Sequence, residues 1–192
     1  WLADLNYMAQ LCCEYLNKIN LKLNAKKSCC IRIGPRFASK CSNIVTKHGI
    51  IEWAKEVKYL GITILSGKSF KVDFSEAKCK FYNSFNALYS RMGKSLDINV
   101  LLHLTQTIAI PMITYGLEGL NINKSTLASL DFCLNRALFK IFRVTTKENI
   151  ALCMSIYNIQ NINELYRKRQ CTFFNSLCKH ENNVLLYIHG VG

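Results

Sequence analysis

The chain has 192 residues, with 25 Lys or Arg against 12 Asp or Glu, so its formal net charge is +13 and its sequence pI is near 9.4. Half of the residues are hydrophobic, and Gly and Pro number only 9 and 2. This composition excludes a disordered tail, a collagen-like fibre and a low-complexity linker, while the length suits one compact domain or two small ones. We take residues 59–65 as the longest apolar stretch, which predicts no membrane span.

The first third of the chain is predicted to form a helix followed by a small antiparallel sheet. Apolar residues at helical spacing predict an amphipathic helix over residues 3–20. Residues 28–33 form an apolar, β-branched run, and residues 44–53 are typical of a hairpin around a His-Gly turn. Residues 57–65 carry apolar side chains on both faces, which predicts one buried strand.

The remainder is predicted to be helical. Apolar faces predict helices over residues 74–92, 101–108, 127–141 and 162–177. Pro111 is expected to break the second of these, and Asn123 or Ser125 to cap the third. With a boundary near Lys68, the expected fold class is α+β: an N-terminal helix plus a small antiparallel sheet, followed by a helical bundle.

The positive charge is concentrated in one stretch. No acidic residue lies between Glu14 and Glu52, and the stretch holds eight basic residues: Lys18, Lys22, Lys26, Lys27, Arg32, Arg36, Lys40 and Lys47. A run of one sign in an apolar chain favours a polyanionic partner, most often nucleic acid, because Lys and Arg release condensed counterions from phosphates. A solvated basic face without a partner is the alternative.

The ten cysteines could serve disulfides, a metal or packing. The first residues show no secretory signal, so a disulfide framework is not expected. A zinc site near Cys171, Cys178 and His180 stays open, although their C-x6-C-x-H spacing offers no obvious fourth ligand. Most of the cysteines fall at apolar positions and are expected to pack as small buried hydrophobes.

The acidic residues are scattered and form no paired motif. Two-metal phosphoryl transfer needs carboxylates held together around the ions, so no catalytic or metal-binding residue is predicted within the chain. Asp4 at the start of a helix fits an interaction with the helix dipole, and His103 beside two leucines is typical of a structural histidine.

Three short segments carry more specific information. They are Leu23-Asn24-Ala25-Lys26-Lys27-Ser28, then Val57-Lys58-Tyr59-Leu60-Gly61, then Tyr115-Gly116-Leu117-Glu118. In this order they resemble the end of the palm, and the region after it, in the reverse transcriptases of non-LTR (LINE-type) retrotransposons. The resemblance covers residues 5–145. It implies that residues 1–68 are the C-terminal part of a polymerase palm and that residues 69–192 are a helical, thumb-like region.

The resemblance also implies roles for three groups of residues. The nucleotide-proximal group, beside the phosphates of the incoming nucleotide, would be Asn24, Lys26 and Lys27. The primer grip, a hairpin that holds the 3′ end of the primer, would be Tyr59, Leu60 and Gly61. Further contacts with the template–primer duplex would come from Arg32, Arg36, Lys78, Lys80, Arg91 and Lys94.

In this family the catalytic aspartates bind two magnesium ions and lie upstream of the matched segments. Because the chain begins at Trp1 rather than Met, we expect a fragment of an intracellular, nuclear or cytoplasmic RNA-directed DNA polymerase. The fragment alone is predicted to be inactive and to hold no cofactor, with Mg²⁺ bound by the complete polymerase. Its expected partners are an RNA template with a DNA primer and the rest of the parent polypeptide.

Two alternatives remain at this stage. One is a non-enzymatic basic module that binds nucleic acid. The other is a helical protein-interaction domain, in which a groove for the partner would be formed by Phe81, Tyr82, Phe85 and Tyr89.

Overall fold

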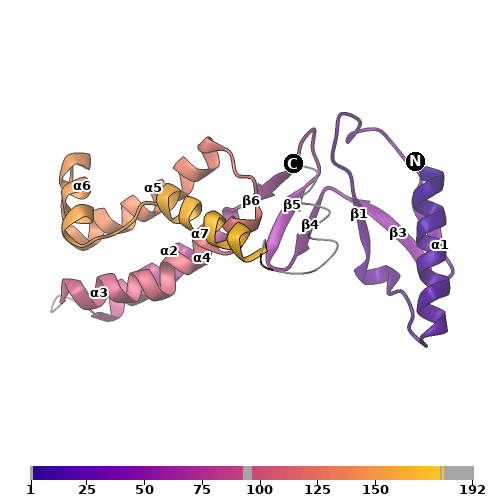
Figure 1. The fold of residues 1–192 in the computed structure, drawn as a ribbon, viewed down its shortest axis with the longest axis horizontal. Helices are drawn as coiled ribbons and strands as arrows, with labels where there is room; N and C mark the ends of the chain where they lie inside the picture. The colour runs from indigo at the N-terminus through magenta and orange to yellow at the C-terminus, as the bar shows by residue number, and fades with distance from the viewer. Residues whose placement is uncertain (1, 93–96, 178, 180–192) are drawn as a thin grey trace. The chain divides into compact units, whose positions relative to one another are not determined.

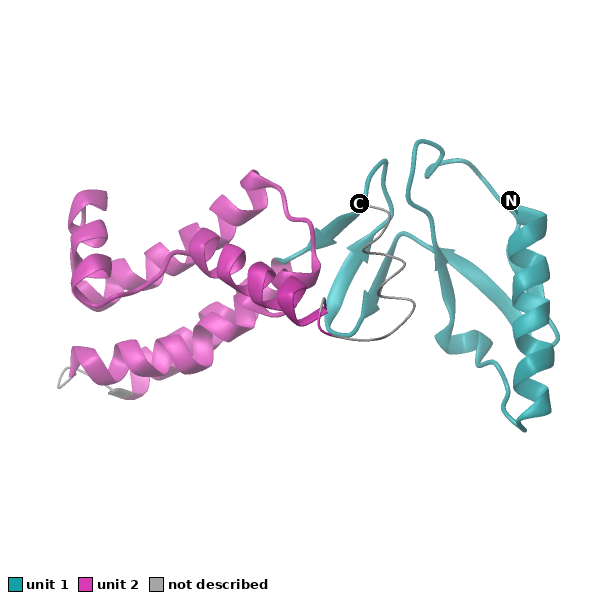
Figure 2. Cartoon of the chain, viewed as in Figure 1, with its two compact units in different colours: residues 1–74 teal, residues 75–192 magenta. Residues whose placement is uncertain are grey.

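The computed structural model describes residues 2–92, 97–177 and 179, which form two compact units, residues 1–74 and residues 75–192 (Figure 1, Figure 2). The first combines one α-helix with two small sheets, and the second is helical, so the α+β class is confirmed. The second unit begins at Ser75, seven residues beyond Lys68, because strand β6 (Lys71–Asp73) still pairs with the sheet before it.

The first sheet of the N-terminal unit has the strand order β1-β3-β2. Strands β2 (Ile44–Thr46) and β3 (Gly49–Ala54) form the predicted antiparallel hairpin. Strand β1 (Cys29–Ile31) pairs parallel to β3, so the expectation of a purely antiparallel sheet is wrong. Helix α1 (Leu2–Lys18) packs against β2 and covers a small core of Ala25, Ile44 and Ile51 (Figure 1).

The second sheet contains β4 (Glu56–Tyr59), β5 (Ile62–Leu65) and β6, all antiparallel. The prediction of one buried strand over residues 57–65 is wrong, because the chain reverses at Leu60 and Gly61. Both residues have positive φ, 48° and 79°, which is the geometry of a two-residue type I′ turn. Apolar side chains on both faces therefore belong to a half-exposed hairpin and not to a buried strand.

The two sheets are joined within this unit by short polar contacts. Ile33 forms a parallel bridge with Gly67, and the Gly34 N–H donates to the Gly67 carbonyl at 2.8 Å. The Ser66 hydroxyl donates to the Arg32 carbonyl at 2.7 Å. These contacts attach residues 32–34, directly after β1, to residues 66 and 67, in the loop between β5 and β6.

The second unit is a packed set of helices. Its elements are α2 (Ser75–Met92), α3 (Ile98–Leu104), the π-helical turn η2 (Thr105–Ala109), α4 (Ile110–Thr114), the 3-10 turn η3 (Leu117–Gly119), α5 (Lys124–Phe142), α6 (Lys147–Ile156) and α7 (Ile162–Leu177). Asn123 caps α5 as predicted, since its Oδ1 accepts the Thr126 N–H at 2.8 Å. Helix α6 was not anticipated from the sequence.

Pro111 does not break the helix, contrary to prediction. The chain stays helical from Ile98 to Thr114, and the turn before the proline is widened into a π-helix in which the Ile110 N–H donates to the Thr105 carbonyl. In a regular α-helix the proline ring would clash with the carbonyl four residues earlier. A π-helical turn inserts one residue and relieves such a clash, so the helix continues.

Among the described residues, the stretch Ile98–Gly119 is long and apolar enough to cross a membrane by length and composition alone. The longest apolar stretch is therefore not residues 59–65, as we assumed from the sequence. One face of the stretch is buried in the helical unit, through Leu101, Leu102, Thr105, Ala109, Ile113 and Leu117. This burial is typical of a core helix, and the absence of a membrane partner stays a prediction.

The turn at Leu60 generates a stability prediction. A leucine in the left-handed region costs roughly 1–2 kcal/mol, whereas Asn visits that region readily. Leu60→Asn should therefore raise the free energy of unfolding of the N-terminal unit by about 1 kcal/mol. Urea denaturation followed by tryptophan fluorescence measures this, because both tryptophans belong to residues 1–74.

Tyr59→Asn is the matched control, since Tyr59 is the last residue of β4 and has no positive φ to relieve. Its substitution should lower stability or leave it unchanged. Equal unfolding midpoints for Leu60→Asn and the parent chain would contradict strain at the turn.

Candidate nucleic-acid interface

The lysine turn, residues 24–28, is held rigidly on the first sheet. The Asn24 Oδ1 accepts the Lys27 N–H at 3.1 Å, and the Ser28 hydroxyl donates to the Asn24 carbonyl at 2.9 Å, closing the 3-10 turn η1 (Ala25–Lys27). Ala25 is buried beneath the turn. Asn24 thus caps the turn, while the side chains of Lys26 and Lys27 are exposed to solvent.

A close approach between Ala25 and Gly49 determines where the lysine turn lies. A Cβ added to Gly49 would come within 3.0 Å of the Ala25 Cβ, and the φ of Gly49 is 134°. A side chain at this position would crowd Ala25 and strain the backbone, so glycine is strongly favoured at the start of β3. The turn therefore sits directly against the β2–β3 hairpin.

The tip of the β4–β5 hairpin presents the predicted primer-grip residues. Tyr59 and Leu60 are 64% and 71% exposed, which is unusual for large apolar side chains placed side by side. Gly61 completes the turn at positive φ. The structure therefore places this apolar tip on the second sheet, whereas the lysine turn lies against the first.

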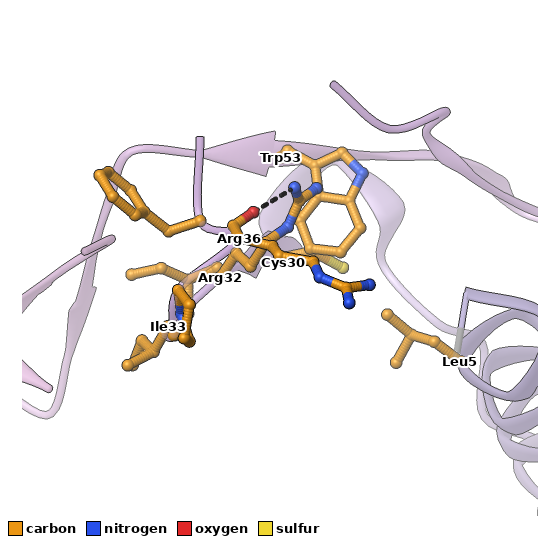
Figure 3. Close-up of a pocket in the computed structure, with 10 residues that line it drawn as sticks. Leu5, Cys30, Arg32, Ile33, Arg36 and Trp53 are labelled. Atoms are coloured by element: carbon orange, nitrogen blue, oxygen red, sulfur yellow. Dashed lines mark hydrogen bonds between the residues drawn. The ribbon is translucent and has the colours of Figure 1, made fainter. Parts of the chain in front are cut away.

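Arg32 and Arg36 meet at a hollow beside the first sheet. The Arg32 guanidinium lies 4.6 Å from the centre of the Trp53 ring, and its Nη1 donates to the carbonyl oxygens of Arg36, at 3.2 Å, and Ser39 (Figure 3). The Trp53 Nε1–H donates in turn to the Ser42 carbonyl at 3.0 Å. Arg32 thus holds the loop that carries Arg36, and the side chain of Arg36 is exposed.

Two of the basic residues predicted on helix α2 are engaged in contacts within the helical unit. The Lys78 Nζ donates to the Ser129 Oγ at 2.7 Å and thereby links α2 to α5, and Lys80 forms an exposed ion pair with Glu76 at 2.8 Å. Lys78 and Lys80 are two residues apart and so do not share a helix face. Arg91 is exposed, and Lys94 lies outside the described residues.

The aromatic residues of α2 are mainly core residues. Phe81 and Phe85 are buried and stack with their ring centres 6.3 Å apart, which contradicts the alternative in which they line a groove for a protein partner. Burial, together with a hydrogen bond to Cys133 of α5, raises the pKa of Tyr82 to about 12. Tyr82 therefore stays neutral at physiological pH and contributes to packing between α2 and α5.

The cysteines behave differently from the sequence-based expectation. Of those described, only Cys13 and Cys133 are buried, and Cys12, Cys29, Cys79 and Cys171 are exposed. Burial, and then the neighbouring Cys29, raises the pKa of the Cys30 thiol, which lines the hollow beside Arg36. Within the described ranges no three His, Cys, Asp or Glu side chains gather as a metal site. Cys178 and His180 lie outside those ranges.

The fold and this surface define an α+β protein whose N-terminal unit presents exposed lysines on a rigid turn, an apolar hairpin tip and an arginine-lined hollow. No family model, curated protein or solved structure matches the chain. The hollow was not foreseen from the sequence, because Arg32 and Trp53 are 21 positions apart, Arg32 in the loop directly after β1 and Trp53 in β3. The acid-free charge run and the resemblance both included Arg32 and Arg36, but neither indicated a hollow.

The contact between Lys78 and Ser129 generates a second prediction. Lys78→Ala should lower the free energy of unfolding of the helical unit by about 1 kcal/mol, because a half-buried hydrogen bond from a charged donor is lost. Ser129→Ala should cost a similar amount, and the double variant little more than either. Thermal or urea denaturation followed by far-UV circular dichroism measures these values.

Lys80→Ala is the control, because its exposed ion pair with Glu76 should contribute no more than about 0.5 kcal/mol. Equal losses for Lys78→Ala and Lys80→Ala, or additive losses in the double variant, would contradict the assigned bridge between α2 and α5.

Proposed function

We propose that the chain is part of the RNA-directed DNA polymerase of a non-LTR retrotransposon and that it binds the RNA template and DNA primer. The observation that carries this proposal is the exposure of Lys26 and Lys27 on a turn fixed by the Asn24 cap and the Ala25 anchor. The ordered segments 23–28, 57–61 and 115–118 supply the resemblance on which the polymerase class rests.

The chemistry of the lysine turn suits phosphate. Two ammonium groups on a fixed backbone form compact point charges, and each keeps its hydration and rotatable donors. They lie within the stretch that holds no acidic residue, so no neighbouring carboxylate in that stretch competes for them. Phosphates of a nucleotide or of a duplex backbone are the anions that such an arrangement attracts.

The hairpin tip suits the end of a primer. Tyr59 and Leu60 offer apolar surface that can pack against a sugar or a base, and the tight turn lets the backbone approach closely. Catalysis would come from aspartates and Mg²⁺ elsewhere in the parent polypeptide. The chain would then contact nucleotide and duplex without performing the transfer itself.

The lysine turn generates a binding prediction. The chain should bind an RNA–DNA template–primer duplex with log K falling linearly against log salt concentration. Lys26→Ala with Lys27→Ala should weaken binding and reduce the magnitude of the slope by about 1.8, since each phosphate contact contributes about 0.9. Fluorescence anisotropy with a labelled duplex at several salt concentrations measures both effects.

Lys124→Ala with Lys147→Ala removes the same charge from the first positions of α5 and α6 and is the matched control. Cations at helix N-termini are unfavourable, so this variant should fold at least as well as the parent. If both double variants change the slope equally, the binding reflects net charge and the assignment to the lysine turn fails.

The lack of paired carboxylates generates a separate prediction. The chain should not extend a labelled primer on an RNA template in the presence of Mg²⁺ and deoxynucleotides, because two-metal transfer requires carboxylates that bridge the ions. Gel analysis beside an active reverse transcriptase tests this. Template-dependent extension by the isolated chain would contradict the proposal that this chain binds nucleic acid while another part of the parent polypeptide performs catalysis.

A further inference from the structure

The hollow beside Arg36 has the size and lining of a ligand site. Its volume is about 520 Å³, and its walls are mainly apolar side chains from α1, β1, β3 and the loop after β1. The residues that matter here are Leu5, Cys30, Ile33, Phe37 and Trp53. Pockets for small ligands range from about 300 to 1,000 Å³ and combine apolar walls with a few polar groups.

The loop that frames the hollow is held in place before any ligand arrives. The Gly34 N–H donates to the Gly67 carbonyl at 2.8 Å, and the Phe37 N–H donates to the Gly34 carbonyl at 3.1 Å. Arg32 adds its donations to the carbonyls of Arg36 and Ser39 while it stacks on Trp53. A loop fixed in this way loses little entropy when a ligand binds.

The two arginines of the hollow have different tasks. Arg32 is engaged with Trp53 and the loop carbonyls, so it positions the wall. Among the described residues, the Arg36 guanidinium has no hydrogen-bond or ion-pair partner, and its side chain is exposed at the edge of the hollow (Figure 3). An apolar hollow bordered by one available guanidinium fits a flat apolar group that carries a phosphate.

We infer that this hollow binds an unstacked base of single-stranded RNA or DNA, with Arg36 on the adjacent phosphate. The inference rests on the proposed function and names a second class of nucleic acid for the same unit. Bases within a duplex are stacked on both faces and cannot enter, whereas bases of a single strand pack on aromatic and apolar side chains. Phe37 and the exposed edge of the hollow at Ile33 supply that surface.

The experiment compares labelled single-stranded RNA, single-stranded DNA and a blunt RNA–DNA duplex by anisotropy. Phe37→Ala should weaken both single strands by about 5- to 10-fold and leave the duplex within about twofold, because only an unstacked base can pack on the phenylalanine ring. Arg36→Ala should weaken the single strands and reduce their salt slope by about 0.7. A loss restricted to RNA would overturn the inference, because it would assign the contact to the 2′-hydroxyl and not to the base.

Two matched controls separate the hollow from general effects. Phe70→Ala removes an exposed phenylalanine of the same unit, and Arg167→Ala removes an exposed arginine of α7; neither residue lines the hollow. Both should bind all three nucleic acids like the parent chain. The inference is overturned if Phe37→Ala binds single strands like the parent, or if it weakens the duplex equally.

A direct readout covers the case in which Phe37→Ala perturbs folding. Trp1→Phe leaves Trp53 as the sole tryptophan, and adenosine monophosphate entering the hollow should quench its fluorescence in a saturable way. Arg36→Ala should abolish the quenching, and an unchanged emission would overturn the inference. The lysine-turn variant can leave duplex binding unchanged while Phe37→Ala still weakens the binding of single strands. In that case the proposed function fails, whereas the inference that the hollow binds an unstacked base is kept.

Discussion

The close packing of Ala25 against Gly49 is the contact on which the N-terminal surface depends. It brings the lysine turn onto the β2–β3 hairpin, and β1 then leaves the turn in register with β3. The loop after β1 carries Arg32 and Arg36 to the hollow, and its bridge to Gly67 joins the two sheets. A methyl group added at Gly49 would press on the Ala25 Cβ and strain the backbone, so it would shift the lysine turn relative to the hairpin.

The helical unit shows how charged residues can serve structure where the sequence indicates an interface. Within the unit, Lys78 donates a hydrogen bond to Ser129, and Lys80 forms an ion pair with Glu76. Lys140 likewise lies 4.5 Å from the ring centre of Tyr89 and donates to Asn86 at 3.3 Å. Lys78 and Lys140 therefore each link helix α2 to helix α5, so part of the positive charge of this unit contributes to helix packing.

Local signals in the sequence were sufficient for several elements. The His48-Gly49 turn predicted the β2–β3 hairpin, and Asn123 predicted the start of α5, because both features act within a few residues. Hydrophobic periodicity missed the turn at Leu60, because leucine is not a residue that a type I′ turn favours, whereas the resemblance implied a hairpin at Tyr59, Leu60 and Gly61. The helix continues through Pro111 because of a π-helical turn, and no pattern in the sequence predicted this turn. The hollow depends on Arg32 and Trp53, whose pairing is visible only after the sheet has formed.

The parallel pairing of β1 with β3 has a consequence for the order in which the N-terminal unit assembles. Antiparallel hairpins between neighbouring strands close within about 1–10 microseconds, because their loops are short. Cys29 pairs with Glu52, far along the chain, so β1 can dock only on a β2–β3 hairpin that already exists. The lysine turn precedes β1 and rests on the same hairpin. The fixed spacing of Lys26 and Lys27 therefore depends on a strand that is synthesised after them, since the surface beneath the lysine turn is incomplete until residue 54 has been made.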